Sequence, residues 1–147
     1  MILGYRSDVR IVTSKKGFDE LKKFTDDYLK AKNYTYGNLL DDCKVISENS
    51  YSKYFGWDSI KWYENCDDYE DVDAVMEGLH HLADKDFSYR YARIGESYDD
   101  YEEMYNESNI EEEQDLEFPS YIRYFDDDYT KDMMKQNDIG EELAVWS

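Results

Sequence analysis

The order of apolar patterns in the first 95 residues is the feature that most limits the possible folds. Four segments contain the β-branched and aromatic residues that are typical of strands, and they are 9–14, 43–47, 52–65 and 87–95. Two further segments, 17–32 and 69–86, carry apolar residues at the spacing of amphipathic helices. The chain therefore begins with a strand, a helix, two strands, a helix and a strand.

This order predicts an α+β, ferredoxin-like fold, in which a four-stranded antiparallel sheet carries both helices on one face. The other face would be left open for a partner or for the rest of the chain. The alternation of strand residues slips near Gly56, so we expect a β-bulge at or beside this residue. Residues 116–125 have the composition of a further strand, and residues 139–146 have the spacing of a short helix that docks elsewhere.

The charge of the chain is concentrated in one segment. The 147 residues have a net charge of -19, and residues 1–95 contain 18 acidic and 14 basic residues. Residues 96–128 contain 14 acidic residues and a single basic one, Arg123. We therefore expect a core of residues 1–95 and an acidic, tyrosine-rich extension of residues 96–147 that packs on it. Such a charge argues against direct binding to DNA, RNA or anionic membranes and suits a partner with a basic surface.

The histidines and cysteines do not form a recognisable catalytic or metal-binding motif. His80 and His81 are adjacent on a predicted helix, so they do not share a face and do not form a paired metal site. The helical pattern places His81 away from the apolar stripe and His80 at its border. Neither Cys43 nor Cys66 lies in a nucleophile signature, and both are expected as free thiols, with a single disulfide left open.

The segment 126–138 resembles a calcium loop only superficially. An EF-hand requires Gly at the sixth position and Glu at the twelfth, and these positions hold Lys131 and Asn137. No glycine-rich phosphate loop is present in the sequence. The sequence therefore predicts a protein that is not an enzyme and that has no metal and no cofactor.

The acidic segment contains aromatic residues, which solvated acidic tails usually lack. Tyr98, Tyr101 and Tyr105 have a spacing that would let one side of a helix pack while the carboxylates face outward. If residues 96–117 were helical, their 11 acidic residues would span about 33 Å. This is about 3 Å of axis per charge, close to the ~3.4 Å per phosphate along one DNA strand. The residues expected to contact a basic partner are Glu96, Asp99, Asp100, Glu102, Glu103, Glu107, Glu111, Glu112, Glu113, Asp115, Glu117, Asp126, Asp127 and Asp128.

The stretches "YDDYEEMYNESNIEEEQD" and "YFDDDY" resemble the small, acidic, tyrosine-rich DNA mimics of phages and mobile elements. Anti-CRISPR and anti-restriction proteins belong to this group. The resemblance covers about 33 residues, is one of general character, and carries no diagnostic motif. It implies an inhibitor of a nucleic-acid-binding defence enzyme in the cytoplasm of a bacterial host. The first candidate is the RNA-guided nuclease of a type II CRISPR system, which holds DNA in basic channels.

Three other interpretations remain open at this stage. In the first, the acidic segment is a solvated appendage. In the second, the open face of the sheet sequesters a small molecule. In the third, the chain is a regulatory partner of a basic host protein. The sequence contains no signal peptide and no apolar run long enough to span a bilayer, which favours the cytoplasm in each of them.

Overall fold

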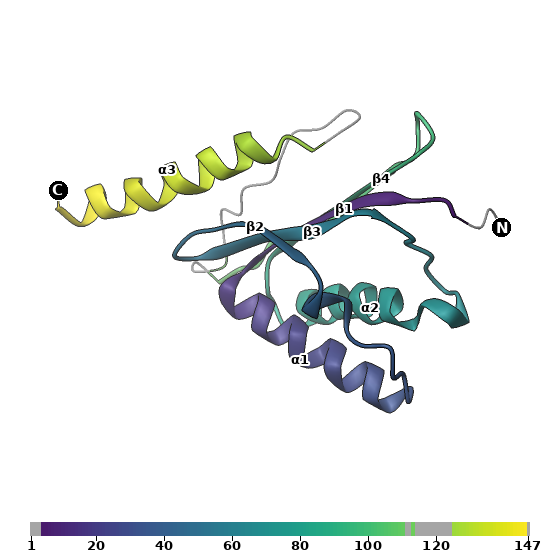
Figure 1. Ribbon diagram of the computed structural model, residues 1–147. Helices are drawn as coiled ribbons and strands as arrows, with labels where there is room; N and C mark the ends of the chain where they lie inside the picture. Colours follow the sequence, from purple (N-terminus) through teal and green to yellow (C-terminus); the bar gives the residue numbers. More distant parts are fainter. Residues whose placement is uncertain (1–3, 111–112, 114–124, 147) are drawn as a thin grey trace.

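The computed structural model describes residues 4–110, 113 and 125–146, with the side chains of residue 67 and residues 139–146 left out. It contains one antiparallel sheet with the strand order β2-β3-β1-β4-β5. The strands are β1 (Ser7–Ser14), β2 (Lys44–Glu48), β3 (Ser52–Ile60), β4 (Tyr89–Gly95) and β5 (Tyr101–Asn106). Helices α1 (Lys15–Ala31) and α2 (Glu70–Asp84) lie on one side of this sheet, and α3 (Asp127–Trp146) lies on the other (Figure 1).

The predicted fold, a four-stranded ferredoxin-like sheet with two helices, is wrong. The sheet has five strands and the described chain has three α-helices, together with short 3₁₀ helices at Leu39–Asp41 and Asp67–Tyr69. The six elements expected within residues 1–95 are all present in the expected order. The difference arises after Gly95, where acidic residues that were assigned to a possible helix form β5 and pair with β4 instead.

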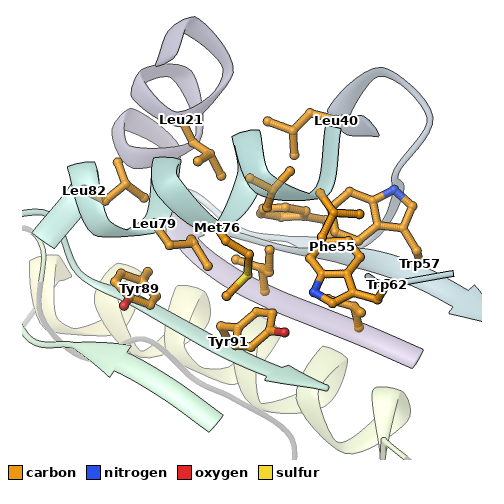
Figure 2. Close-up of a cluster of buried hydrophobic side chains, with 14 residues drawn as sticks. Leu21, Leu40, Phe55, Trp57, Trp62, Met76, Leu79, Leu82, Tyr89 and Tyr91 are labelled. Atoms are coloured by element: carbon orange, nitrogen blue, oxygen red, sulfur yellow. The ribbon is translucent and has the colours of Figure 1, made fainter. Parts of the chain in front are cut away.

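The main core lies between the sheet and the first two helices. Ser14 caps α1, because its hydroxyl accepts a hydrogen bond of 2.9 Å from the Gly17 amide. Leu21 of α1 and Leu79 of α2 are fully buried and face the aromatic residues of the sheet. Figure 2 shows this packing, in which the strands contribute Phe55, Trp57, Tyr89 and Tyr91 to the same cluster. Apolar burial of this kind contributes about 25 cal/mol per Å² to stability.

The glycine at position 56 is needed because β3 and β1 approach each other closely there. A Cβ atom at this position would lie 2.0 Å from the carbonyl oxygen of Val9. The register between β1 and β3 shifts between Ser7 and Val9, so the extra residue of β3 falls at 58–59, where Ser59 has a φ of 54°. The predicted bulge is therefore displaced from Gly56 itself. The alternation is lost mainly because both faces of β3 are covered, and Tyr54 on the other face is as buried as Phe55.

Helix α3 covers part of the sheet face that lies opposite α1 and α2 (Figure 1). Met134 is 1% exposed and packs with Val12 and Tyr54 in a second, smaller core. The side-chain amide of Asn49 donates a 3.0 Å hydrogen bond to the carbonyl of Met134. The helix also begins earlier than the predicted segment 139–146. The sheet face opposite α1 and α2, which was expected to receive a partner or the rest of the chain, is thus covered over parts of β1, β2 and β3 by the rest of the chain.

Two predictions about the last third of the chain fall outside the described residues. They are the additional strand at 116–125, of which only Phe125 is described, and the docking of the side chains of residues 139–146. Cys43 and Cys66 are free thiols. A search of the described residues for a helix with the length and apolar character of a membrane span finds none.

Candidate functional site: the acidic β4–β5 hairpin

The hairpin of β4 and β5 brings half of the described acidic residues of the predicted partner site to one edge of the sheet. Its two strands are antiparallel, with Tyr89 opposite Asn106 at one end and Ile94 opposite Tyr101 at the other. The connection closes through a 2.7 Å hydrogen bond from the Gly95 amide to the Asp100 carbonyl. A Cβ atom on Gly95 would lie 2.0 Å from the Asp100 carboxylate, so a side chain there would displace this carboxylate from its present position. The tip of the hairpin points away from α1 and α2 (Figure 1).

Two acidic residues of the hairpin are used inside the protein. The guanidinium of Arg93 donates two hydrogen bonds to Asp100, of 2.8 and 3.1 Å, and one of 3.1 Å to Glu102. Glu102 also accepts a 2.6 Å hydrogen bond from the hydroxyl of Tyr91, and Asp100 accepts one from Tyr5. The hydrogen bonds from Arg93 hold the pKa of Asp100 below its usual value. Asp100 and Glu102 therefore fasten the hairpin to the core and are poorly placed to contact a partner.

The opposite side of β5 faces solvent. Side chains alternate along a strand, so Tyr101, Glu103 and Tyr105 lie on one face and Glu102 on the other. Tyr101 and Tyr105 are 61% and 66% exposed, and Tyr98 in the turn is 78% exposed. Alternate residues on a strand are separated by roughly 7 Å. We call this exposed set, Tyr98, Asp99, Tyr101, Glu103 and Tyr105, the β5 surface.

The helical array of carboxylates that was considered for this segment does not form over residues 101–106. Residues 101–106 form a strand, whose period of two replaces the period of 3.6 that the prediction assumed. Tyr101 and Tyr105 still share a face, because a separation of four residues does so in either element. The carboxylates do not all face outward, since Glu102 is directed to the core while Glu103 stands between the exposed tyrosines.

Three other predicted residues near the hairpin make internal contacts. Glu96 accepts a 3.2 Å hydrogen bond from the Arg6 amide, and Glu107 lies 3.7 Å from the guanidinium of Arg90. Glu113 is 4% exposed and accepts a 3.2 Å hydrogen bond from the Ser88 amide. Glu113 is therefore a buried structural residue rather than part of an outer surface.

The three aspartates before and within α3 have different roles. Asp126 caps the helix, since its side chain accepts a 3.0 Å hydrogen bond from the Tyr129 amide. Asp127 accepts hydrogen bonds from Arg10 at 3.2 Å and from the Tyr54 hydroxyl at 2.6 Å. Burial would raise the pKa of Asp127, but these hydrogen bonds and the charge of Arg10 hold it below its usual value. Asp128 is exposed. The remaining predicted residues lie outside the described ones: Glu111, Glu112, Asp115 and Glu117.

Sequence reasoning missed the arginines that organise this site. Arg93 ties the hairpin together, and Arg90 lies with its guanidinium carbon 5.7 Å from the centre of the Tyr105 ring. Arg10 is 4% exposed on the central strand β1 and pairs with Asp127 and Asp58. A basic residue inside an otherwise apolar strand pattern, as in "VRIV", was the available signal for a buried partner carboxylate.

The histidine orientations are the reverse of those expected. His80 is exposed, whereas His81 stacks on Phe24 at 4.7 Å and lies 2.8 Å from the Glu20 carboxylate. The prediction considered only the apolar stripe of α2. In the structure α1 packs against α2, and this contact determines which side of α2 is buried. Among the described residues, no group of three or more His, Cys, Asp or Glu side chains has an arrangement that would hold a metal ion.

Comparisons with known protein families, with curated proteins and with solved structures find no match.

Proposed function

We propose that this chain is a binding protein whose β5 surface covers a basic, nucleic-acid-binding surface of another protein and so excludes the nucleic acid. The observation that carries the proposal is the outward face of β5, where exposed tyrosines alternate with a carboxylate in a chain of net charge -19. The first candidate partner is a defence enzyme, and among these the RNA-guided nuclease of a type II CRISPR system.

The chemistry of this surface suits arginine and lysine side chains. A carboxylate binds a guanidinium by charge-assisted hydrogen bonds, and a tyrosine ring attracts the same cation at its face. Arg90 beside the Tyr105 ring illustrates this arrangement within the chain itself. Tyrosine is also enriched at protein interfaces, where a rigid ring gives a large contact area at low cost in side-chain entropy.

The charge of the whole molecule supports a basic partner. Opposite fields steer two proteins together and raise the association rate, and this steering is screened by salt. The same field repels phosphates, so direct binding of DNA or RNA to this protein is expected to be weak at physiological salt. A gel-shift titration of this protein with duplex DNA that gave micromolar or tighter binding would contradict the proposal.

The test uses a purified, guide-loaded type II nuclease and its target duplex. Increasing amounts of this protein are expected to abolish DNA binding by the nuclease, and excess duplex added first is expected to protect it. A nuclease that binds this protein and DNA at the same time would contradict the proposed exclusion. If this nuclease does not bind the protein, the same titration with a restriction endonuclease tests the wider class.

A further inference from the structure

A second surface feature lies at the end of the helix layer where α1 finishes and α2 begins (Figure 1). The loop after α1 and the residues at the start of α2 line a surface pocket with a volume of about 440 Å³. Its lining consists of Asn33, Tyr34, Thr35, Tyr36, Asp68 and Glu70. We call it the Tyr34–Tyr36 pocket, and none of these residues belongs to the β5 surface.

Two tyrosine rings form adjoining walls of this pocket. The ring centres of Tyr34 and Tyr36 are 5.3 Å apart and their planes make an angle of 66°. Tyr36 is 87% exposed, the largest exposure among the described large apolar residues. A side chain this exposed buries little area in the fold, and most of its surface is accessible to a ligand.

The pocket is held in shape by hydrogen bonds at both ends of its loop. At one end, the Tyr34 amide donates a hydrogen bond of 2.9 Å to the Leu29 carbonyl. At the other end, the buried Asn38 side chain donates to the Thr25 hydroxyl at 2.7 Å and accepts from the Leu40 amide at 2.9 Å. The two ends of the loop that carries the tyrosines are therefore fixed before a ligand binds, which lowers the entropy that is lost on binding.

The electrostatic environment of the pocket favours a cation. Its lining contains the carboxylates of Asp68 and Glu70 and includes no Lys, Arg or His. Glu70, Asp71 and Asp73 occupy the first turn of α2 and outweigh the roughly half positive charge of that helix end. Burial, followed by the negative charge of Asp71, raises the pKa of Tyr34 to about 12, so its ring stays neutral at physiological pH.

We propose that the Tyr34–Tyr36 pocket binds an organic cation, either an alkylammonium or a guanidinium group. Two neutral aromatic rings at a steep angle, beside two carboxylates, provide the cation–π and ionic attraction that such groups require. A metal ion is a poorer fit, because the pocket is walled by rings rather than by converging oxygen ligands. This site is independent of the proposed function, since it lies on other residues and takes its own ligand.

The experiment compares a cation with its neutral isostere. The full-length protein is titrated with choline and, separately, with 3,3-dimethylbutan-1-ol, which has the same shape without the charge, and binding is followed by NMR at fixed salt. We expect choline to bind with a Kd on the order of 1 mM, and the alcohol to bind at least ~10-fold more weakly. Equal binding of choline and the alcohol, or no saturable binding of either choline or N-acetyl-arginine amide, would overturn the proposal.

A parallel titration with N-acetyl-arginine amide identifies the source of the cation. Tighter binding of this compound than of choline assigns the pocket to an arginine side chain, and the reverse order assigns it to a small quaternary ammonium compound. Saturable binding of either is consistent with the proposal.

Variants of the pocket separate specific binding from general attraction to an acidic protein. The exchange Tyr36→Leu removes the ring of an exposed residue and is expected to weaken choline binding about tenfold, whereas Tyr36→Phe keeps the ring and the affinity. The matched control Tyr105→Leu removes a similarly exposed ring from the β5 surface and is expected to leave choline binding unchanged. An equal effect of Tyr36→Leu and Tyr105→Leu, or no effect of Tyr36→Leu, would contradict the assignment of the site.

Discussion

Asp127 and Asp128 are adjacent in the sequence, yet they have different consequences for the protein. Asp127 accepts hydrogen bonds from the buried Arg10 and from Tyr54, so it connects the first turn of α3 to the two central strands of the sheet. Asp128 faces solvent. Arg10 is also held by Asp58 at 2.6 Å and lies against the ring of Phe125. Arg10 is a buried charged group, and the stability of the fold depends on its being paired.

Replacing Asp127 is expected to be far more costly than replacing Asp128. The exchange Asp127→Asn removes one partner of a buried cation, and we expect the free energy of unfolding to fall by about 2–3 kcal/mol. The matched exchange Asp128→Asn removes the same charge from an exposed position and is expected to change it by less than about 0.5 kcal/mol. Urea unfolding measures both, and equal losses would show that Arg10 does not depend on Asp127.

The same contacts predict a loss of stability in acid. The pKa values of Asp100 and Asp127 are lowered from 3.8 in the folded protein, by the hydrogen bonds and charges of Arg93 and Arg10 respectively. Such groups stabilise the fold fully above pH 3.8 and lose this contribution as the pH falls through the lower folded value. Unfolding free energies measured between about pH 6 and pH 2 should therefore fall below about pH 4. The decrease should be smaller for Asp127→Asn, and an identical decrease would contradict this origin.

At the scale of the elements, β5 and α3 explain both what the sequence predicted and what it did not. The strands and helices within residues 1–95 were predictable, because their apolar periodicity reflects a main core whose buried side chains all come from those residues. β5 was missed because its inward face carries Glu102, which forms an ion pair with Arg93, and only one apolar residue, Met104, so the face has no apolar stripe. α3 was missed over residues 127–138 because only Thr130 and Met134 of that stretch are buried.

The small core beneath α3 yields a prediction with a matched control. Met134 is 1% exposed, whereas its neighbour Met133 is half-buried. We expect Met134→Ala to lower the free energy of unfolding by about 2 kcal/mol or more and to speed hydrogen exchange in α3. Met133→Ala has the same change in helix propensity and is expected to cost less than about 1 kcal/mol. Equal effects would show that α3 is not held through Met134.

For the molecule as a whole, the sign of the charge and its position along the chain were predictable from the sequence. Which carboxylates face the core and which face solvent was not. Asp100, Glu102, Glu113 and Asp127 are turned inward, where each accepts hydrogen bonds from the core. Contacts between residues that are distant in the sequence decide which carboxylates turn inward. The positions of the charges along the sequence do not reveal these contacts. The exposed acidic and aromatic residues of the hairpin remain as the β5 surface. The proposed function depends on this smaller set.

The net charge also predicts a dependence of stability on salt. A chain with 36 acidic and 17 basic residues repels itself when folded, and salt screens this repulsion. We expect the thermal midpoint to rise as NaCl increases from about 0.01 M to about 0.3 M. A midpoint that falls over this range would show that the ion pairs of Arg10, Arg93 and their partners outweigh the repulsion.

The most direct test of the account is capture of partners from a bacterial lysate, with and without excess duplex DNA. It is carried out with the wild-type chain, with Asp99→Asn/Glu103→Gln, and with Asp19→Asn/Asp27→Asn, a pair of exposed α1 residues that removes the same charge. The account predicts that the wild-type chain captures basic DNA-binding proteins and that duplex DNA displaces them. The change in the β5 surface is expected to weaken capture about tenfold and the α1 control to have little effect. Partners that remain bound in excess DNA, or equal losses from the two variants, would contradict the claim that the β5 surface takes the place of nucleic acid.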